Sequence, residues 1–271
     1  MIYKQVTIAS TDKSLRELLI ALLSEADYEG FEETNSELHA FITEEAFTEE
    51  SLHDILQTFG LNYTVATIPK TNWNKDWESN FQPVIVSGFC TIRADFHEIV
   101  VHTPYEIIIT PKMSFGTGHH ATTQLMMRMM QEVSFRGKSV LDFGTGTGIL
   151  AILAEKLGAD QVLAIDNDEW SYENALENAG KNDCHRIHFA LGSLESVHET
   201  FDVILANINR HILIQYMEKL YHVTCADGTV LMSGLLVEDK EVIVQAAEAN
   251  GFNLKAYKDE QNWIALCFVK N

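Results

Sequence analysis

Two glycine-rich stretches of this 271-residue chain share the string Phe-Gly-Thr-Gly, at residues 115–118 and 143–146. Either one could bring the backbone close to a nucleotide-like ligand. In the second, Gly144, Gly146 and Gly148 directly follow the apolar run SVLDF and directly precede ILAILAEKLG. A glycine loop between a strand and a helix is the context that a nucleotide site requires. The second stretch is therefore the stronger candidate for a cofactor site.

Two carboxylates near the second stretch indicate which cofactor suits it. Asp166 ends the run QVLAID, where a carboxylate can accept hydrogen bonds from both ribose hydroxyls. Asp142 lies two residues before Gly144, where it would repel a pyrophosphate but attract the ammonium end of S-adenosylmethionine. The spacing Gly-x-Gly-x-Gly also differs from the dinucleotide pattern. We therefore predict S-adenosylmethionine rather than NAD, with a role of Asp142 in capping the following turn as the alternative.

Asn207 is the candidate catalytic residue. It ends the run FDVILAN, at the edge of a predicted parallel sheet where ligands bind in such folds. Its side-chain carbonyl can accept an N–H bond from a target amine and orient the nitrogen lone pair toward a sulfonium methyl group. The amine must be neutral to attack, which desolvation favours. The alternative is an Asn that only ends a strand and starts a turn.

The elements that must position these residues follow an alternation of strands and helices from residue 84 onward. Several runs are apolar throughout, which is typical of parallel strands buried on both faces. The pattern predicts a doubly wound α/β sheet, with an antiparallel hairpin over 252–269 at its edge. The predicted strands are 106–110, 139–143, 161–166, 187–191, 201–207 and 228–234, and the predicted helices are 121–133, 149–158 and 169–182.

The first part of the chain has a different pattern. Residues 1–68 read as strand, helix, strand, strand, helix, strand, which predicts a small α+β ferredoxin-like domain. Residues 69–83 carry three aromatic side chains on one helical stripe and predict a connector helix that packs against a domain. The stripe consists of Trp73, Trp77 and Phe81. We thus expect domains at 1–68 and 84–271, joined by the connector at 69–83.

Charge and composition narrow the class of partner. The chain carries a net charge of −20, and residues 1–65 hold 3 basic and 13 acidic residues. This negative charge repels nucleic acid and would attract a basic macromolecule, although an acidic surface also aids solubility.

No apolar run is long enough to span a bilayer, and the first residues lack a signal-peptide layout, so we expect a cytoplasmic protein. The four separated cysteines are expected to be buried reduced thiols.

Taken together, these residues resemble the bacterial ribosomal protein L-eleven methyltransferases over nearly the whole chain. General methyltransferases share the later glycine loop, whereas the earlier loop with its histidines and paired threonines is characteristic of this family. The motifs that carry the resemblance are the acidic first part, NWNKDWESNFQP, FGTGHHATT, LDFGTGTGILAI, AIDND and ANI.

The resemblance implies a class I Rossmann-like methyltransferase domain that uses S-adenosylmethionine. It also implies that the first domain recognises the ribosomal protein, and that lysine side-chain amines and an N-terminal amine are methylated, typically to the trimethyl state. Residues Phe115–Gly118 are expected to fold over the methionine end of the cofactor. The predicted cofactor-binding residues are Phe115, Gly116, Thr117, Thr123, Asp142, Gly144, Gly146, Asp166 and Asn207.

The chain departs from the family where many members have Thr-His-Pro in place of His119, His120 and Ala121. After ANI, Asn209 and Arg210 are polar where other members are often small or apolar. The roles of His119, His120 and Arg210 stay unassigned, and we predict no metal, since no Cys or further His lies at ligand spacing. We expect a monomer that binds neither nucleic acid nor a membrane. An N-methyltransferase of another protein or of a small amine, and a cofactor-binding regulator without turnover, remain alternatives.

Overall fold

The computed structural model describes residues 3–28, 30–34, 36–68, 82–98, 103–110 and 116–271. The chain divides into two compact units, Met1–Asn80 and Phe81–Asn271, and each is described by itself. The predicted connector helix at 69–83 lies outside the described residues except for its last two positions.

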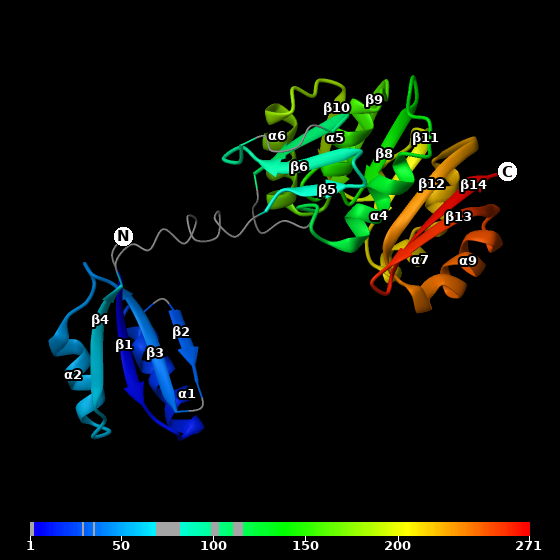
Figure 1. The fold of residues 1–271 in the computed structure, drawn as a ribbon. Coiled ribbons are helices and arrows are strands. Elements are labelled where there is room, and N and C mark those ends of the chain that lie inside the picture. The colour runs from blue at the N-terminus through cyan, green and yellow to red at the C-terminus, as the bar shows by residue number, and fades with distance from the viewer. Residues whose placement is uncertain (1–2, 29, 35, 69–81, 99–102, 111–115) are drawn as a thin grey trace. The chain divides into compact units, whose positions relative to one another are not determined.

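The first unit is a four-stranded sheet with two helices (Figure 1). Its strands and helices occur in the predicted order. The strands are arranged β2-β3-β1-β4, and every neighbouring pair is antiparallel. The elements are β1 (Tyr3–Ala9), α1 (Lys13–Glu25), β2 (Gly30–Glu33), β3 (Glu37–Thr43), α2 (Glu49–Gln57) and β4 (Tyr63–Ile68).

One face of this sheet is buried by the two helices. Alternate residues of a strand point to the same face, and residues three or four apart share one face of a helix. Both periods are visible in the cluster that fills the unit, which forms its own hydrophobic core. The cluster consists of Val6, Ile8, Leu19, Leu23, Tyr28, Leu38, Ala40, Ile42, Leu52 and Leu56.

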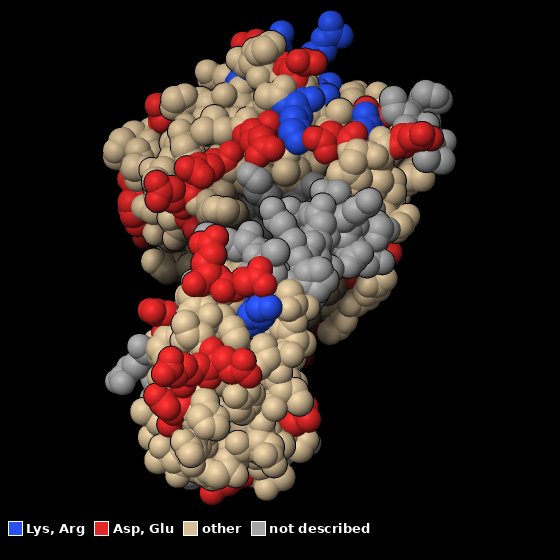
Figure 2. Space-filling model, turned by 90° about the vertical axis from the view of Figure 1, so that its left-hand side faces the viewer, with Lys and Arg blue, Asp and Glu red and all other residues tan. Residues whose placement is uncertain are grey.

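The surface of the first unit is acidic, and Figure 2 shows groups of carboxylate side chains on it. The basic side chains described in this unit are both engaged: Arg16 is buried and donates to the Ser10 carbonyl at 2.7 Å, and the Lys4 Nζ lies 3.0 Å from the Glu44 carboxylate. The described surface therefore presents mainly negative charge. The exposed carboxylates are those of Asp12, Asp27, Glu32, Glu44, Glu45, Glu49, Glu50 and Asp54.

The second unit is built on a seven-stranded sheet in the order β10-β9-β8-β11-β12-β14-β13. Strands β10 to β12 run parallel, and β14 is antiparallel to both of its neighbours, so the predicted parallel sheet and C-terminal hairpin are confirmed. The strands are β8 (Ser139–Phe143), β9 (Gln161–Asp166), β10 (Ile187–Leu191), β11 (Phe201–Asn207), β12 (Thr224–Leu236), β13 (Phe252–Glu260) and β14 (Trp263–Lys270). The helices are α4 (Ala121–Met130), α5 (Ile149–Lys156), α6 (Glu169–Lys181), α7 (Arg210–Gln215), α8 (Met217–His222) and α9 (Lys240–Ala249).

The strand predicted at 106–110 does not join this sheet. It forms β7 (Tyr105–Ile109) in a separate sheet with β5 (Val84–Val86) and β6 (Cys90–Ala94). Two asparagines contact its C-terminal end: Asn182, the C-cap of α6, accepts the Ile108 N–H at 2.9 Å, and Asn178 of α6 accepts the N–H of Thr110, just after β7, at 2.7 Å. These two hydrogen bonds, from backbone N–H groups to asparagine side-chain oxygens, hold the end of β7 beside α6.

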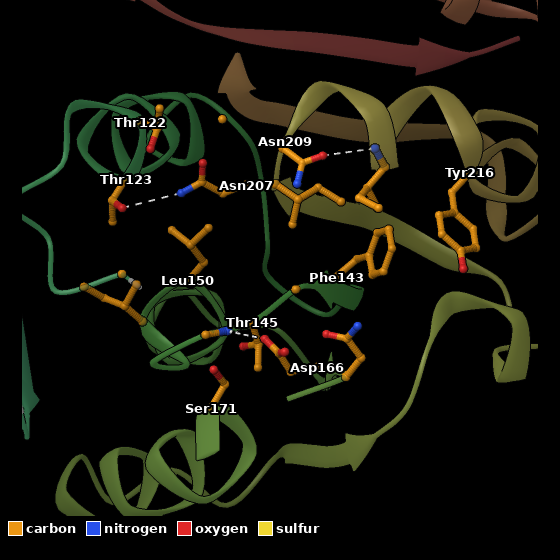
Figure 3. Close-up of a pocket in the computed structure, with 18 of the residues that line it drawn as sticks. Thr122, Thr123, Phe143, Thr145, Leu150, Asp166, Ser171, Asn207, Asn209 and Tyr216 are labelled. Carbon is orange, nitrogen blue, oxygen red and sulfur yellow. Dashed lines mark hydrogen bonds between the residues drawn. The ribbon is translucent and has the colours of Figure 1, made fainter. Parts of the chain in front are cut away.

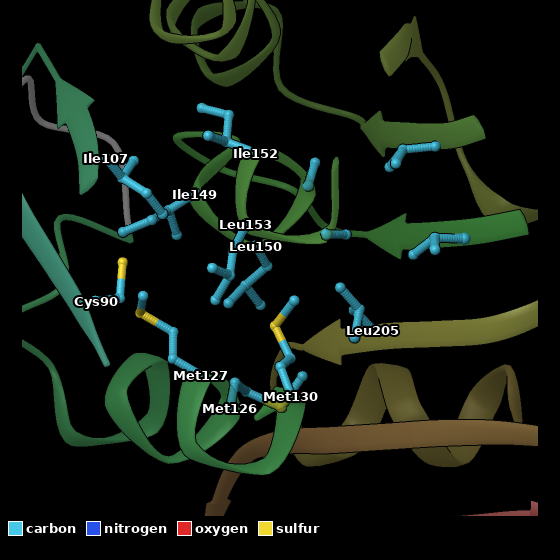
Figure 4. Packing of buried hydrophobic residues seen from close by; sticks show 14 of the residues in the cluster. Cys90, Ile107, Met126, Met127, Met130, Ile149, Leu150, Ile152, Leu153 and Leu205 are labelled. Carbon is cyan, nitrogen blue, oxygen red and sulfur yellow. The ribbon is translucent and has the colours of Figure 1, made fainter. Parts of the chain in front are cut away.

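Two hydrophobic clusters cover the two faces of the seven-stranded sheet. Helices α4, α5 and α6 pack on the face that carries Val140, and α7, α8 and α9 pack on the face that carries Leu141. In Figure 4, Met127 of α4 points toward Cys90, and Met130 lies near Leu150 and Leu205, all within one of these clusters. The methionine-rich stretch of α4 is therefore core, as predicted, because flexible thioethers fill irregular gaps.

The described residues contain no helix that is long and apolar enough to cross a membrane. All four cysteines are free thiols, and Cys90 and Cys267 are buried whereas Cys184 and Cys225 are half-buried. Burial raises the pKa of Cys90 and of Cys184 to about 12. These two thiols therefore stay protonated and unreactive at neutral pH.

The separate core of the first unit predicts a local response to a cavity. Leu52→Ala removes a fully buried side chain of α2 and is expected to lower the free energy of unfolding of the first unit by about 2–5 kcal/mol. Leu18→Ala, at a side chain that is 47% exposed in the same unit, is expected to change it by less than about 0.5 kcal/mol. Urea unfolding followed with probes in each unit measures both. A shift of the second unit's transition in Leu52→Ala would contradict the independence of the two cores.

Candidate active site

A cavity of about 630 Å³ lies at the carboxyl edge of the parallel strands of the second unit (Figure 3). The loops after β8, β9, β10 and β11 all contribute to its wall, because the carboxyl ends of parallel strands meet at one edge of a sheet. The start of α4 and the hairpin between β13 and β14 complete it. Its lining includes Gly116, His120, Thr122, Thr123, Phe143, Gly144, Thr145, Gly146, Leu150, Asp166, Asn167, Ser193, Asn207, Ile208, Asn209, Tyr216, Gly234 and Trp263.

The glycine loop after β8 needs its first glycine for steric reasons. Gly144 has a positive φ of 74°, and a Cβ atom there would lie 2.4 Å from the Ile208 side chain. Its N–H donates to the Ile165 carbonyl at 2.9 Å, which ties the loop to the end of β9. Gly144 and Gly146 both line the cavity, and their contact with a cofactor stays a prediction.

Asp166 lies at the end of β9 and lines the cavity. Its carboxylate accepts the Gly146 N–H at 2.8 Å and the Asp168 N–H at 3.1 Å. These two bonds orient the carboxylate and leave lone pairs on both oxygens. The side chain can therefore accept further hydrogen bonds from hydroxyl groups in the cavity.

Asp142 lies in the interior of the unit, behind the glycine loop. It is fully buried and does not line the cavity. One carboxylate oxygen accepts the Thr145 hydroxyl at 2.6 Å and the Ala151 N–H at 3.1 Å, whereas the other is buried without a donor among the described residues. Burial raises the pKa of Asp142 to about 7, against the opposing effect of those two hydrogen bonds. The contacts described for Asp142 thus organise the loop from behind, and its contact with a ligand stays a prediction.

Asn207 lines the cavity and carries a side-chain acceptor that has no donor among the described residues. Its Nδ2 donates weakly to the Thr123 hydroxyl, 3.5 Å away, and both residues line the cavity (Figure 3). Its Oδ1 is buried and has no donor among the described residues. A buried carbonyl without a partner is costly, so this atom is suited to a ligand N–H or O–H.

A hydrogen bond joins the first Phe-Gly-Thr-Gly string to the loop that contains the second. The Thr147 hydroxyl donates to the Gly116 carbonyl at 2.7 Å, and Gly116 lines the cavity. Thr117 does not line it; the Thr117 hydroxyl lies 3.4 Å from the His119 ring nitrogen. Phe115 lies outside the described residues.

The histidines without an assigned role make structural contacts. His119 lies 2.9 Å from the Gln82 carbonyl through its Nε2. His120 is the N-cap of α4, where its Nδ1 accepts the Thr122 N–H, and its ring packs edge-on against Trp263 with the centroids 4.7 Å apart. His120 therefore joins the start of α4 to the C-terminal hairpin at the cavity wall. Among the described residues, no three His, Cys, Asp or Glu side chains are placed to bind a metal.

Several cavity residues were missed by sequence reasoning. Phe143 and Tyr216 form an edge-on pair with centroids 5.4 Å apart, and Phe143 could have been found because it directly precedes the glycine loop. Ser193 follows β10, and it could also have been predicted because ligands bind at the carboxyl ends of parallel strands. Trp263 belongs to the antiparallel hairpin, and no local spacing relates it to the other residues.

The burial of Asp142 predicts a pH-dependent contribution to stability. Its pKa is about 7 in the folded protein and about 3.9 in an unfolded chain, so the free energy of unfolding falls as the pH rises through this interval. Asp142→Asn removes this dependence, and its stability relative to wild type is expected to improve by roughly 2–4 kcal/mol between about pH 5 and about pH 8. Urea unfolding at several pH values measures the change.

Asp202→Asn is the matched control. The Ser139 N–H holds the pKa of Asp202 below its usual range, so the stability of this variant relative to wild type is expected to stay constant over the same pH interval. A constant difference for Asp142→Asn as well would show that the Asp142 carboxyl is ionised in the folded protein throughout.

Comparisons with known proteins identify the family. The family model described as "Ribosomal protein L11 methyltransferase (PrmA)" matches residues 4–271. A protein named ribosomal protein L11 methyltransferase from Porphyromonas gingivalis is 42% identical over 93% of this chain and 90% of its own length. One from Phocaeicola vulgatus is 37% identical over 99% of both chains.

Solved structures agree with these matches. A ribosomal protein L11 methylase from Lactobacillus delbrueckii subsp. bulgaricus is 33% identical, with a TM-score of 0.66, over 70% of this chain and 100% of that one. A methyltransferase from Pyrococcus furiosus, 22% identical with a TM-score of 0.51 over 60% of this chain and 89% of its own, shares the fold. The family model spans nearly the whole chain and the relatives cover almost all of it, so the protein belongs to the ribosomal protein L11 methyltransferase family.

Proposed function

We propose that this protein transfers methyl groups from S-adenosylmethionine to amines of ribosomal protein L11. The observation that carries the proposal is that Asn207, whose Oδ1 has no donor among the described residues, lines the cavity in a chain of this family. The chemistry needs an acceptor at this place that can bind an amine N–H without taking its lone pair.

The cavity fits S-adenosylmethionine better than a dinucleotide. Among the described lining residues there is no Lys or Arg, so no positively charged side chain there would pair with a pyrophosphate. Asp166 would accept the ribose hydroxyls, and Gly144 and Gly146 would let the backbone approach the ligand closely. Gly116 and Thr123 would bound the opposite wall. When bound, the cofactor supplies an electrophilic methyl group on a sulfonium that leaves as a neutral thioether.

The residues of the chain would act mainly by positioning. Asn207 Oδ1 would accept one N–H of the incoming amine, which directs the nitrogen lone pair away from that bond and toward the methyl group. The nearby apolar side chains of Leu150, Ile212 and Trp263 would lower the pKa of a lysine amine by desolvation, so that it enters neutral. As the N–C bond forms, the bond between the methyl group and sulfur breaks, and a product ammonium that still carries an N–H loses that proton to solvent.

We also propose that the first unit is a ferredoxin-like domain that recognises the protein substrate. Its support is the strand order β2-β3-β1-β4 with all neighbours antiparallel, and a core made with two helices on one face. Its exposed carboxylates would attract a basic protein such as a ribosomal protein. The proposal includes a monomer acting in the cytoplasm without direct contact to nucleic acid.

Substitution of Asn207 tests the catalytic assignment. Asn207→Ala is expected to lower kcat by about 100-fold or more, because the amine loses its orienting acceptor, while S-adenosylmethionine still binds. Calorimetry and methyl-transfer assays measure the two quantities separately. Asn250→Ala, at the C-cap of α9 on another part of the unit, is the control and should keep its activity. Unchanged kcat in Asn207→Ala would remove the residue from the mechanism.

Labelled methyl transfer into purified ribosomal proteins tests the substrate. Ribosomal protein L11 is expected to take up the label, and its KM is expected to rise several-fold between about 50 mM and about 500 mM salt, while the KM for S-adenosylmethionine stays constant. Label on a different protein would place the chain among methyltransferases of another substrate. A salt-independent KM for the protein would argue against recognition through the acidic surface.

A further inference from the structure

The segment that follows Asn207 is held against β12 by its backbone. The Ile208 N–H donates to the Ser233 carbonyl at 3.2 Å, and β12 changes register between Met232 and Leu235 beside this contact. A Cβ atom on Gly234 would lie only 2.4 Å from the Ile208 carbonyl oxygen. Gly234 also has a positive φ of 83°, so glycine is required there twice over. The segment after Asn207 therefore packs against the irregular part of β12, at Ser233 and Gly234.

An ion pair between Arg210 and Asp239 also joins the segment after Asn207 to the end of β12. Arg210, the first residue of α7, donates through Nη1 to one carboxylate oxygen of Asp239. The other oxygen of Asp239 accepts the Leu236 N–H at 3.0 Å, at the start of the 3₁₀ helix η2 (Val237–Asp239). Asp239 is buried, whereas the Arg210 side chain is 42% exposed. The pair therefore links the residue three positions after Asn207 to the end of β12.

The partner of Arg210 makes this link specific. A buried carboxylate needs compensation, and loss of the guanidinium would leave Asp239 with a single N–H donor. The side chain of the neighbouring Asn209 makes a local contact, since as the N-cap of α7 it accepts the Ile212 N–H at 3.2 Å. Among the described residues, Arg210 is thus the side chain that ties the start of α7 to another element through a charge.

We infer that Arg210 is a positioning residue for methyl transfer. Through Asp239 it fixes the segment that carries Asn207, and so keeps the Asn207 Oδ1 at the cavity wall in the orientation that binds the amine. The inference rests on the proposed function. Arg210 itself does not line the cavity, so it acts on the reaction through Asn207 and not by contact with a ligand.

Arg210→Met tests this inference because it keeps most of the length of the side chain and removes the charge. The expected result is a loss of about tenfold in kcat, with the KM for S-adenosylmethionine within about twofold of wild type, since a small misplacement of the reacting groups slows the chemical step. Arg210→Lys should recover most of the lost rate, because an ammonium can still pair with Asp239. The Arg210→Met, Asp239→Asn double variant should be no slower than the slower single variant, because both changes remove the same link.

Lys138→Met is the matched control. Lys138 lies beside the start of β8 at the opposite edge of the sheet and pairs with Asp202 at 3.4 Å. It should keep the wild-type kcat, since its ion pair is far from the carboxyl edge. Thermal unfolding of all variants shows whether a loss of rate is a loss of folded protein.

Three results would overturn the inference. Arg210→Met could keep its kcat within about twofold, or its melting temperature and cofactor affinity could fall together with kcat. Additive losses in the double variant would show that the two residues act separately. Absence of methyl transfer by the wild-type protein would instead contradict the proposed function, and the inference with it. An active wild type with an equally active Arg210→Met contradicts the inference alone.

Discussion

The close packing of Ile208 between two glycines is the contact on which the candidate active site depends. Its side chain lies where a Cβ atom of Gly144 would be, and its carbonyl lies where a Cβ atom of Gly234 would be. The loop after β8, the segment after β11 and the irregular part of β12 therefore meet at one residue. Asn207 directly precedes Ile208, so the orientation of Asn207 follows from the packing of these three parts of the chain. A site built in this way is organised before any ligand arrives.

Charge is distributed in a way that favours positive ligands. The described cavity wall carries the Asp166 carboxylate and no Lys or Arg, and the described surface of the first unit presents mainly carboxylates. A sulfonium cofactor and a basic protein substrate are both compatible with this distribution. Asp142 is buried behind the glycine loop, where its raised pKa and its bonds to Thr145 and Ala151 are those of a group that holds the loop in shape, and its contact with a cofactor stays a prediction.

Much of the fold follows from local patterns. Continuous apolar runs predicted parallel strands, and these runs do form β8 to β12. Gly144, Asp166 and Asn207 could be predicted as neighbours because each follows such a run, and parallel strands end at one edge. The run at 106–110 could not be placed from local patterns alone. Its composition is that of a buried strand, but the choice of sheet depended on Asn178 and Asn182, which lie in α6 and at its C-cap, far along the chain.

The sequence by itself determined the strands, the glycine loop and the residues that end each strand, because these depend on period and on local backbone geometry. The tertiary structure decided which way each side chain faces and which distant elements meet. Asp142 and Phe143 are adjacent, yet alternation along β8 turns Phe143 toward the cavity and Asp142 toward the start of α5. Trp263 reaches the cavity beside His120 because an antiparallel hairpin closes the sheet, and Arg210 pairs with Asp239 across a connection of helix and strand. Such contacts arise from long-range packing, for which local spacing carries no signal.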